Sequence, residues 1–440
     1  MDPFYKFISH QYRVWDDCRL LESDWIEVSE VWIHEESQKI ISRQRCVAYN
    51  DIDTWLTHTT EEINGLKYSA ILRLVWVKFE HVEKAKHISP RVLDKLIKEF
   101  RIELANEWNS TCFAGTAKFL DPGYPGTGFE PSYSYSICNH PKLTIAWSHT
   151  LTTGLTQGIY FSGTDQIPEL HGLFQSLTSI AKHPMMFSLM FGISLSGLVD
   201  KELKAIKETI RAVEVRTRFH SWASRTESPA QGDNLTLSAG TTGAKTRLAN
   251  LSRRSTVLHE LCKFIRENVH TEYRGSHSAE ILSRLSSTIQ SIEEYTQVLE
   301  KRILLQEADI QFFQQRTEAQ SMVLSNLMAN DQSKTSTNLA NAMQQDSLSI
   351  KTLSLVTMCF LPGTFVATLF SVPLLNWNQS QPDNTENTGK TVDSRFWIYW
   401  AFTIPLTLVT FGFWSLWTLI LKSRTKRSLM EDSISHYKEL

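Results

Sequence analysis

Hydroxyl side chains recur at regular intervals in a strongly apolar segment near the C-terminus. Spacings of 3, 7, 4 and 3 residues, with Leu361 at the one missing position, place them on one seam of a helix: Ser354, Thr357, Thr364, Thr368 and Ser371. Hydroxyl oxygens on such a seam can hydrogen-bond the water around a passing ion without adding charge to a pore. In the alternative interpretation, each hydroxyl bonds back to a carbonyl of its own helix and helps helices to pack in a membrane.

The same register continues toward the N-terminus for about 35 residues. Steps of 3 and 4 residues from Ser354 meet no charged side chain: Ile350, Ser347, Met343, Ala340, Ser336, Ser333, Ala329, Asn326, Met322 and Ala319. An ordinary coiled coil would carry Leu, Ile or Val at such positions. The pattern predicts one long helix whose inner face meets copies of itself around a narrow, water-filled axis. The packing alternative explains single hydroxyls but not this extension beyond the apolar segment.

Two apolar segments are long enough to cross a bilayer, whose hydrocarbon core needs about 20 helical residues. They cover residues 353–375 and 396–421, and neither contains Asp, Glu, Lys or Arg. Trp397 and Trp400 open the second segment, while Trp414 and Trp417 lie near its end, as in interfacial aromatic belts. A buried helix of a soluble protein is the alternative, but such helices are usually shorter and interrupted by charge.

Charges beside these segments predict the topology. Four basic residues in six follow the second segment: Lys422, Arg424, Lys426 and Arg427. The connection at 376–395 is mildly acidic, with Asp383, Glu386 and Asp393 against Lys390 and Arg395. The positive-inside rule places both termini in the cytoplasm and this loop outside. We expect an integral membrane protein of two spans, in the plasma membrane rather than an organelle, whose loop carboxylates attract cations.

Composition and motifs narrow the function further. The 440 residues carry 45 Lys and Arg against 47 Asp and Glu, a formal net charge of −2, so no basic excess points to nucleic acid. The six cysteines form neither a C-x-x-C pair nor a zinc-type cluster with histidine, and the N-terminus does not read as a signal peptide. No hydrolase or kinase motif is found. We therefore expect no enzyme and no cofactor.

The remainder of the chain predicts an α+β cytosolic domain over 1–223. Residues rich in β-branched and aromatic types predict strands near 24–33, 70–80, 133–137 and 143–149. Periodic apolar residues predict a helix over 90–108 and helical structure over 184–222, in which 185–198 is too short to be a span.

Residues 224–246 are rich in Ser, Thr, Gly and Ala and predict a flexible linker. A P-loop interpretation of 240–246 fails, because Ala244 separates Gly243 from Lys245 and no apolar strand precedes it. We expect a helical hairpin and a stalk helix over 247–346, the stalk starting near Glu307. The first span at 347–375, the outer loop at 376–395, the second span at 396–421 and a basic tail at 422–440 complete the organisation.

The run Phe-Leu-Pro-Gly-Thr-Phe-Val-Ala-Thr-Leu-Phe at 360–370, with Lys-Thr at 351–352 and Pro-Leu-Leu-Asn-Trp at 373–377, resembles the CorA magnesium transporter superfamily. In particular it resembles the divergent fungal CorA-like branch, related to the zinc transporter ZntB. The resemblance implies a homopentamer with a funnel-shaped α/β cytosolic domain, a stalk and an axial pore lined by the first span. It implies divalent cations as the transported species, with the bilayer and further copies of the chain as partners.

The family signature Gly-Met-Asn holds a hydrated cation at the outer mouth. Here Ser371, Val372 and Pro373 occupy that position, and Asn376 follows three residues later. The expected pore lining is therefore Ser347, Ile350, Ser354, Thr357, Leu361, Thr364, Thr368 and Ser371, with an apolar gate near Leu361 or Ile350. Loss of the signature leaves a second hypothesis, a non-conducting scaffold or signalling protein that keeps this architecture. An enzyme with a hairpin anchor is a third option without a motif behind it.

Overall fold

The computed structural model describes residues 19–21, 23–34, 36–80, 85–121, 131–139, 143–163, 165–219, 233–270, 279–372 and 396–436, with side chains of 279–285 and 421–436 excepted. The chain divides into two compact units, Met1–Leu327 and Met328–Leu440. The boundary falls within one helix, α8 (Ala279–Ser371). Each unit is described separately below.

Ten strands in the described part of the first unit form one mixed sheet. Its main path runs β1 (Arg19–Leu21), β6 (Ala85–His87), β5 (Leu66–Glu80), β10 (Thr156–Gly163), β9 (Leu143–Thr150), β8 (Ser132–Asn139) and β7 (Ala114–Asp121). Off this path, β2 (Trp25–His34) pairs with β5 and with β3 (Ile40–Ala48), and β4 (Thr60–Ile63) pairs with β5. The β5–β10 and β1–β6 pairs are parallel, and the remaining pairs are antiparallel. The four predicted strands are confirmed as β2, β5, β8 and β9.

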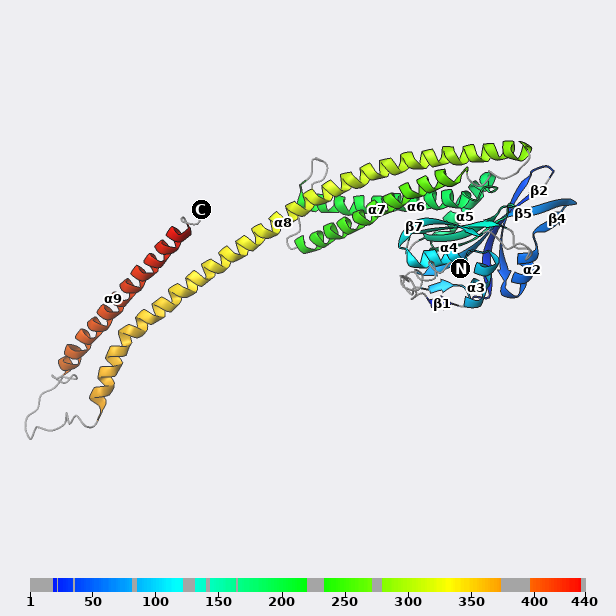
Figure 1. Ribbon diagram of the computed structural model, residues 1–440. Helices are drawn as coiled ribbons and strands as arrows, with labels where there is room; N and C mark the ends of the chain where they lie inside the picture. The colour runs from blue at the N-terminus through cyan, green and yellow to red at the C-terminus, as the bar shows by residue number, and fades with distance from the viewer. Residues whose placement is uncertain are drawn as a thin grey trace, which may run out of the picture. The chain divides into compact units, whose positions relative to one another are not determined.

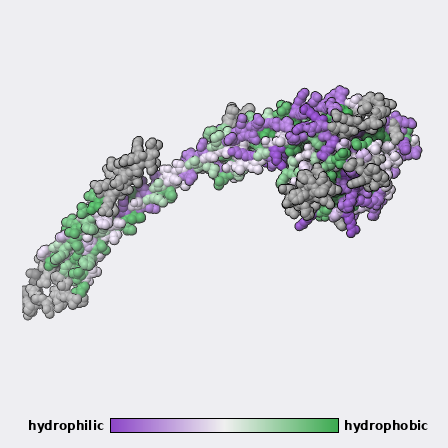
Figure 2. Space-filling model, viewed as in Figure 1, coloured by the Kyte–Doolittle hydropathy of each residue, from purple (hydrophilic) through white to green (hydrophobic). Residues whose placement is uncertain are grey.

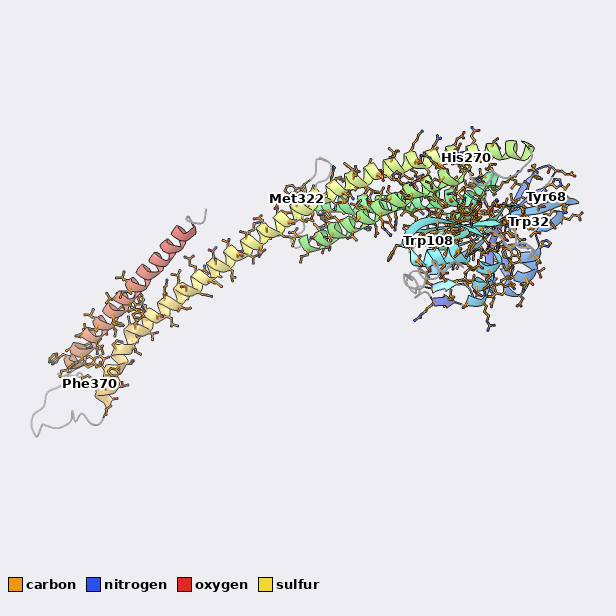
Figure 3. All side chains as sticks on the ribbon, viewed as in Figure 1. Trp32, Tyr68, Trp108, His270, Met322 and Phe370 are labelled. Carbon is orange, nitrogen blue, oxygen red and sulfur yellow. The ribbon has the colours of Figure 1, made fainter. Side chains whose placement is uncertain are left out.

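The sheet separates two hydrophobic cores, because successive strand residues point to opposite faces. In β5, Leu74 and Trp76 belong to one core, and Val75 and Val77 to the other. The first core is shared with α5 (Ile167–Ser176), η2 (Thr178–Ile180), α6 (Met186–Thr217), α7 (Asn234–Asn268) and α8. The second lies under η1 (Tyr49–Asp51), α2 (Ile52–Thr57), α3 (Pro90–Glu99) and α4 (Glu103–Thr111), and Figure 1 shows these layers. A third, small cluster holds Trp32 and Tyr68, which Figure 3 labels.

The predicted helix over 90–108 is wrong as a single element. It is broken between α3 and α4, where Arg101 has a positive φ of 57°. The turn buries Phe100 and Ile102 in the second core. Burial of these two side chains outweighs the helical periodicity that runs across the break. The buried helix over 185–198 is confirmed as the first part of α6, where Met186, Leu189 and Met190 are fully buried.

The predicted linker is also wrong where the structure describes it. Residues 234–246 form the first turns of α7, while 224–232 lie outside the described residues. Thr241, Ala244 and Leu248 are buried in one stripe of α7. Because Thr and Ala are small, the composition of this stretch resembles that of a linker. Arg247 donates to Thr209 Oγ1 of α6 at 3.2 Å. Residues 240–246 are therefore helix, not a phosphate-binding loop.

The long helix begins earlier than predicted. We expected a new helix near Glu307, but α8 runs without interruption from Ala279 to Ser371. The sequence contains neither Gly nor Pro between residues 279 and 361, so nothing breaks the helix there. Glu307 lies mid-helix and accepts hydrogen bonds from Ser255 Oγ at 2.7 Å and from His259 Nε2 at 3.1 Å, both on α7.

The second unit contains the C-terminal part of α8 and α9 (Phe396–His436). Within the described residues, two helices are long and apolar enough to cross a membrane. One is Ser286–Ser371, and the other is Phe396–Ile420. Figure 2 shows the hydrophobic residues gathered along these two segments. The chain therefore has the two apolar helices that its sequence predicts.

Candidate functional site

The structure places the whole expected pore lining on α8. All of these side chains are exposed in the single chain: Ser347, Ile350, Ser354, Thr357, Leu361, Thr364, Thr368 and Ser371. The two candidate gate residues, Ile350 and Leu361, are 64% and 65% exposed. The seam, which consists of hydroxyl side chains and two large apolar side chains, is therefore not buried by other residues of the single chain.

The hydroxyls bond back to carbonyls of their own helix. Thr357 donates to Leu353 O at 2.7 Å, and Thr368 donates to Thr364 O at 2.9 Å. Thr364 and Ser371 likewise donate to carbonyls three or four residues earlier. Because the hydroxyl proton is used inside the helix, each oxygen keeps lone pairs for an outside donor. Water around a cation is such a donor, so back-bonding and a role in hydrating an ion are chemically compatible.

The opposite face of α8 packs against α9. Val366 and Pro362 are buried there, and Tyr399 of α9 donates to Gly363 O at 3.1 Å. Val366 lies two residues from both Thr364 and Thr368, which is about 200° around the helix axis. The hydroxyl seam consequently lies on the side of α8 opposite Val366, where its residues are exposed in the single chain, although Leu361, Thr364 and Thr368 also border a groove that Leu406 and Thr410 of α9 line.

Gly363 makes this close approach possible. A Cβ at this position would lie 3.2 Å from the Tyr399 hydroxyl and 3.6 Å from Thr403 Cγ2. We expect Gly363→Val to separate the two helices and to destabilise the second unit by about 1–3 kcal/mol, as overpacking does. Thermal unfolding of the purified chain in detergent measures the effect. Gly412→Val is the matched control, because a Cβ there meets nothing within 4 Å. Equal midpoints for the two variants would show that the close approach is unimportant.

Two apolar grooves flank the seam between α8 and α9. One, of about 500 Å³, is lined by Leu361, Thr364, Thr368, Leu406 and Thr410 among others. The other, of about 550 Å³, is lined by Met358, Leu361, Val409, Phe413 and Trp417 among others. Leu361 therefore belongs both to the seam and to the grooves beside it.

The expected outer mouth is only partly described. Ser371 is the last residue of α8, and Val372 follows it with 41% of its side chain exposed. Pro373, Asn376, Asp383, Glu386 and Asp393 lie outside the described residues. The cation-holding role of this mouth and of the acidic loop stays a prediction.

Sequence reasoning missed a buried ion pair in the first unit. Glu30 of β2 and Arg73 of β5 are fully buried, and Arg73 Nε lies 3.4 Å from Glu30 Oε1. Glu30 also accepts from Trp55 Nε1 at 2.8 Å and from Arg45 Nε at 3.0 Å. Arg73 donates to Leu56 O at 3.0 Å and to His58 O. The pair ties α2 to the sheet, and its sequence signals are Glu30 within the strand run at 25–33 and Arg73 within the apolar run at 70–77.

Burial lowers the pKa of Arg73, and the adjacent Glu30 opposes this effect. Two indole rings also face the guanidinium carbon, Trp32 at 5.9 Å and Trp55 at 5.2 Å from their centroids. Arginine keeps its charge under such conditions, so the pair is ionic. The Glu30 carboxylate is fully buried and already accepts from Trp55 and Arg45 beside Arg73, which is a structural role.

Two buried histidines, His149 and His183, also lie outside the seam. Burial lowers the pKa of His149 to about 3 and that of His183 to about 4. His183 Nε2 donates to Val269 O at 3.1 Å, and its Nδ1 accepts from Met185 N at 3.1 Å. In the part of the chain that the structure describes, no group of three His, Cys, Asp or Glu residues could hold a metal ion.

These histidines make stability depend on pH. Because the folded pKa of His183 lies below the usual value of 6.5, its contribution is complete above pH 6.5 and is lost as the pH falls toward 4. We expect about 3 kcal/mol of stability to be lost over this range from His183 alone. Denaturant unfolding at several pH values measures it, and His183→Gln is expected to flatten the profile. The same substitution at the exposed His58 is the control, and identical profiles for wild type and His183→Gln would contradict the assignment.

Comparison with known proteins gives limited matches. No family model matches the sequence. The Notoamide biosynthesis cluster protein M' of Aspergillus versicolor is 44% identical over 66 residues, which are 15% of this chain and 13% of that relative. The match therefore spans a small part of the relative's own length.

Two solved structures are similar at low TM-scores. The full-length CmaX protein gives a TM-score of 0.35 at 13% identity, covering 89% of this chain and 98% of that chain. The ZntB cytoplasmic domain from Vibrio parahaemolyticus gives 0.34 at 13% identity, covering 68% of this chain and 98% of that one.

Proposed function

We propose that the chain forms a membrane channel or transporter for divalent metal cations of the Mg²⁺ or Zn²⁺ kind. The observation that carries the proposal is the exposed hydroxyl seam of α8, turned away from the face that packs on α9. The seam would be covered if several copies of the chain packed with their seams around one axis. A homopentamer with both termini in the cytoplasm of a plasma membrane is the arrangement that the family resemblance suggests.

In this proposal a hydrated cation moves down its electrochemical gradient along the seam. The oxygens of Thr357, Thr364 and Thr368 accept hydrogen bonds from the water shell, since their own protons are used inside the helix. Leu361 or Ile350, repeated around the axis, forms an apolar constriction that closes the path by dewetting. At the outer mouth, Ser371 offers a hydroxyl, and the carboxylates of Asp383, Glu386 and Asp393 raise the local cation concentration.

The choice of cation comes from the resemblance of residues 351–377 to the CorA superfamily and not from a charged site. A seam without carboxylates leaves the ion its water shell, which suits Mg²⁺, because this ion dehydrates reluctantly. Transport of Zn²⁺, Co²⁺ or Ni²⁺ in a hydrated form uses the same path.

A second candidate function rests on one specific observation. Ser371, Val372 and Pro373 stand where the family carries Gly-Met-Asn, so the outer cation site lacks its asparagine at that position. A membrane-anchored scaffold that keeps the architecture without conduction would tolerate this change.

Uptake by the purified protein in liposomes separates the two functions. Vesicles containing a divalent-ion indicator are exposed to Mg²⁺, Zn²⁺, Co²⁺ or Ni²⁺ under an inside-negative membrane potential. The transporter predicts uptake of at least one of these ions, increasing with the potential. An intact oligomer with no uptake of any of the four supports the scaffold instead.

A further inference from the structure

Two cysteines that lie 26 residues apart in the chain meet at one end of α4. Cys112 directly follows the last residue of α4, and Cys138 is the penultimate residue of β8. The thiol of Cys138 donates a hydrogen bond to the main-chain oxygen of Cys112 at 3.7 Å. Figure 3 labels Trp108, which lies one turn before Cys112 on α4. The fold therefore brings together two thiol-bearing residues that the sequence separates.

This hydrogen bond sets an upper limit on the separation of the two residues. A carbonyl oxygen lies about 2.4 Å from the Cα atom of its own residue, so the Cys138 sulfur is within about 6 Å of the Cys112 Cα atom. Disulfides join residues whose Cα atoms are usually about 4.4–6.8 Å apart. Rotation of the Cys112 side chain and a small shift of its backbone would bring the two sulfurs to bonding distance.

The backbone at Cys112 lies where such a shift is possible. Cys112 and Phe113 form the connection between α4 and β7, and Cys112 has an extended backbone with φ −117° and ψ 140°. β7 ends the main path of the sheet and pairs with β8 alone among the described strands. A short connection beside an edge strand moves more easily than a residue inside a helix or a central strand.

The two thiols differ in their access to solvent. Cys138 is fully buried, and burial, with a further effect of the adjacent Cys112, raises the pKa of its thiol to about 12, although a backbone hydrogen bond with Gly115 opposes the shift. Cys112 is half-buried, and its sulfur lies 3.6 Å from the hydroxyl oxygen of Thr111. Of the two, Cys112 is the thiol that a dissolved oxidant reaches, while Cys138 is shielded from it.

We propose that Cys112 and Cys138 are an oxidation site, at which hydrogen peroxide converts the two thiols to a disulfide. The Cys112 thiolate attacks one oxygen of the peroxide, the O–O bond breaks, and Cys112 becomes a sulfenic acid while water leaves. The Cys138 sulfur then attacks the Cys112 sulfur. An S–S bond forms, the S–OH bond breaks, and the hydroxyl group leaves as water with the Cys138 proton. In total the two thiols lose two electrons and two protons, and one peroxide becomes two water molecules.

The disulfide would close a loop that contains the whole of β7. Cys112 precedes β7 and Cys138 lies on the strand after it, so the bond ties the edge strand to β8. In a cytoplasmic first unit, which the charges beside the spans lead us to expect, reducing conditions keep the pair as thiols and make the disulfide a transient product of oxidation. For this compartment alone, the inference rests on the proposed function.

Peptide mapping of the purified full chain in detergent tests the proposal. The protein is freed of reducing agent, treated with hydrogen peroxide, blocked with iodoacetamide and digested with trypsin. Cleavage after Arg101, Lys118 and Lys142 places the two cysteines on separate peptides, 102–118 and 119–142. A disulfide therefore appears in the mass spectrum as a linked pair of these peptides, lighter than their sum by two hydrogen atoms.

We expect the linked pair at a yield at least about tenfold above that of any link to Cys46 or Cys262, because a disulfide needs neighbouring Cα atoms. Dithiothreitol is expected to restore both thiols. Oxidation of Cys112 to sulfinic acid while Cys138 stays reduced would overturn the proposal. This map of the wild type needs no substitution, so it decides the proposal even where a variant does not fold.

Cys138→Ala tests the order of the two steps. Without the second thiol the sulfenic acid of Cys112 persists, so its labelling by dimedone is expected to rise at least about fivefold above wild type. Cys112→Ser is expected to leave Cys138 reduced, because peroxide does not reach a fully buried thiol. Cys262→Ala is the matched control, since burial raises the pKa of this thiol also to about 12, and it is expected to form the link normally. Equal dimedone labelling of wild type and Cys138→Ala would contradict Cys138 as the second thiol.

The outcome is independent of transport, because the reaction is carried out without cations or a membrane potential. A linked peptide pair without cation uptake in liposomes would retain the oxidation site and reject the proposed transport. Uptake by the wild type without the linked pair would do the reverse.

Discussion

Thr364→Leu is expected to abolish divalent-cation uptake into liposomes while leaving the oligomer intact. Thr364 is exposed in the middle of the hydroxyl seam, so leucine there adds an apolar side chain on the proposed path. The hydrogen bond from Tyr399 of α9 to Gly363 O does not involve the Thr364 side chain. Loss of the hydroxyl removes an acceptor for the water around the ion, and the larger apolar group favours dewetting. We expect uptake to fall at least about tenfold.

The effect is measured with an entrapped indicator, and the oligomer by mass photometry of the same preparation. Thr364→Ser is the matched variant, because it keeps the hydroxyl with less bulk, and it is expected to retain uptake. Unchanged uptake by Thr364→Leu vesicles that contain intact oligomer would count against a path along this seam.

Arg73→Met is expected to give the largest loss of stability, about 3–5 kcal/mol, because it leaves the carboxylate of Glu30 without its fully buried partner and the carbonyls of Leu56 and His58 without their donor. Both side chains are fully buried, so water cannot replace the lost contact. Unfolding of the full chain in detergent, followed by tryptophan fluorescence, reports the change, since Trp32 and Trp55 face the guanidinium.

Two further variants identify the source of that loss. Arg45→Met removes a partner of Glu30 whose own side chain is 42% exposed, and it is expected to cost less than about 1 kcal/mol. Glu30→Gln combined with Arg73→Met removes both charges, and it is expected to be less destabilised than Arg73→Met alone. Additive effects of the two substitutions would contradict an uncompensated buried charge as the cause.

The two apolar spans and the seam of α8 could be predicted from the sequence, because each of these features depends on the residues of a single helix. The length of the charge-free runs at 353–375 and 396–421 predicts spanning helices without knowledge of neighbours, and the structure has helices at both places. The spacing of Ser354 to Ser371 predicts a shared face, and all these residues lie exposed on α8. Predicted strands rich in β-branched residues were likewise confirmed.

The features that were missed depend on contacts between distant segments. The role of Glu30 in β2 is clear only from its contact with Arg73, which lies 43 residues later in the chain. Thr241 and Ala244 are typical of a linker by composition, and only the packing of α7 beside α6 shows that they are buried in a helix.

Chemical block of single cysteines in the span tests the central claim, that cations pass along the hydroxyl seam, most directly. In a Cys359→Ser background, Thr368→Cys and Leu369→Cys place exposed thiols on neighbouring positions about 100° apart around α8. A charged, membrane-impermeant methanethiosulfonate reagent is applied to liposomes, and cation uptake is recorded before and after modification. The account predicts that the reagent stops uptake through Thr368→Cys and leaves uptake through Leu369→Cys unchanged. Uptake through Thr368→Cys that persists after complete modification would contradict it.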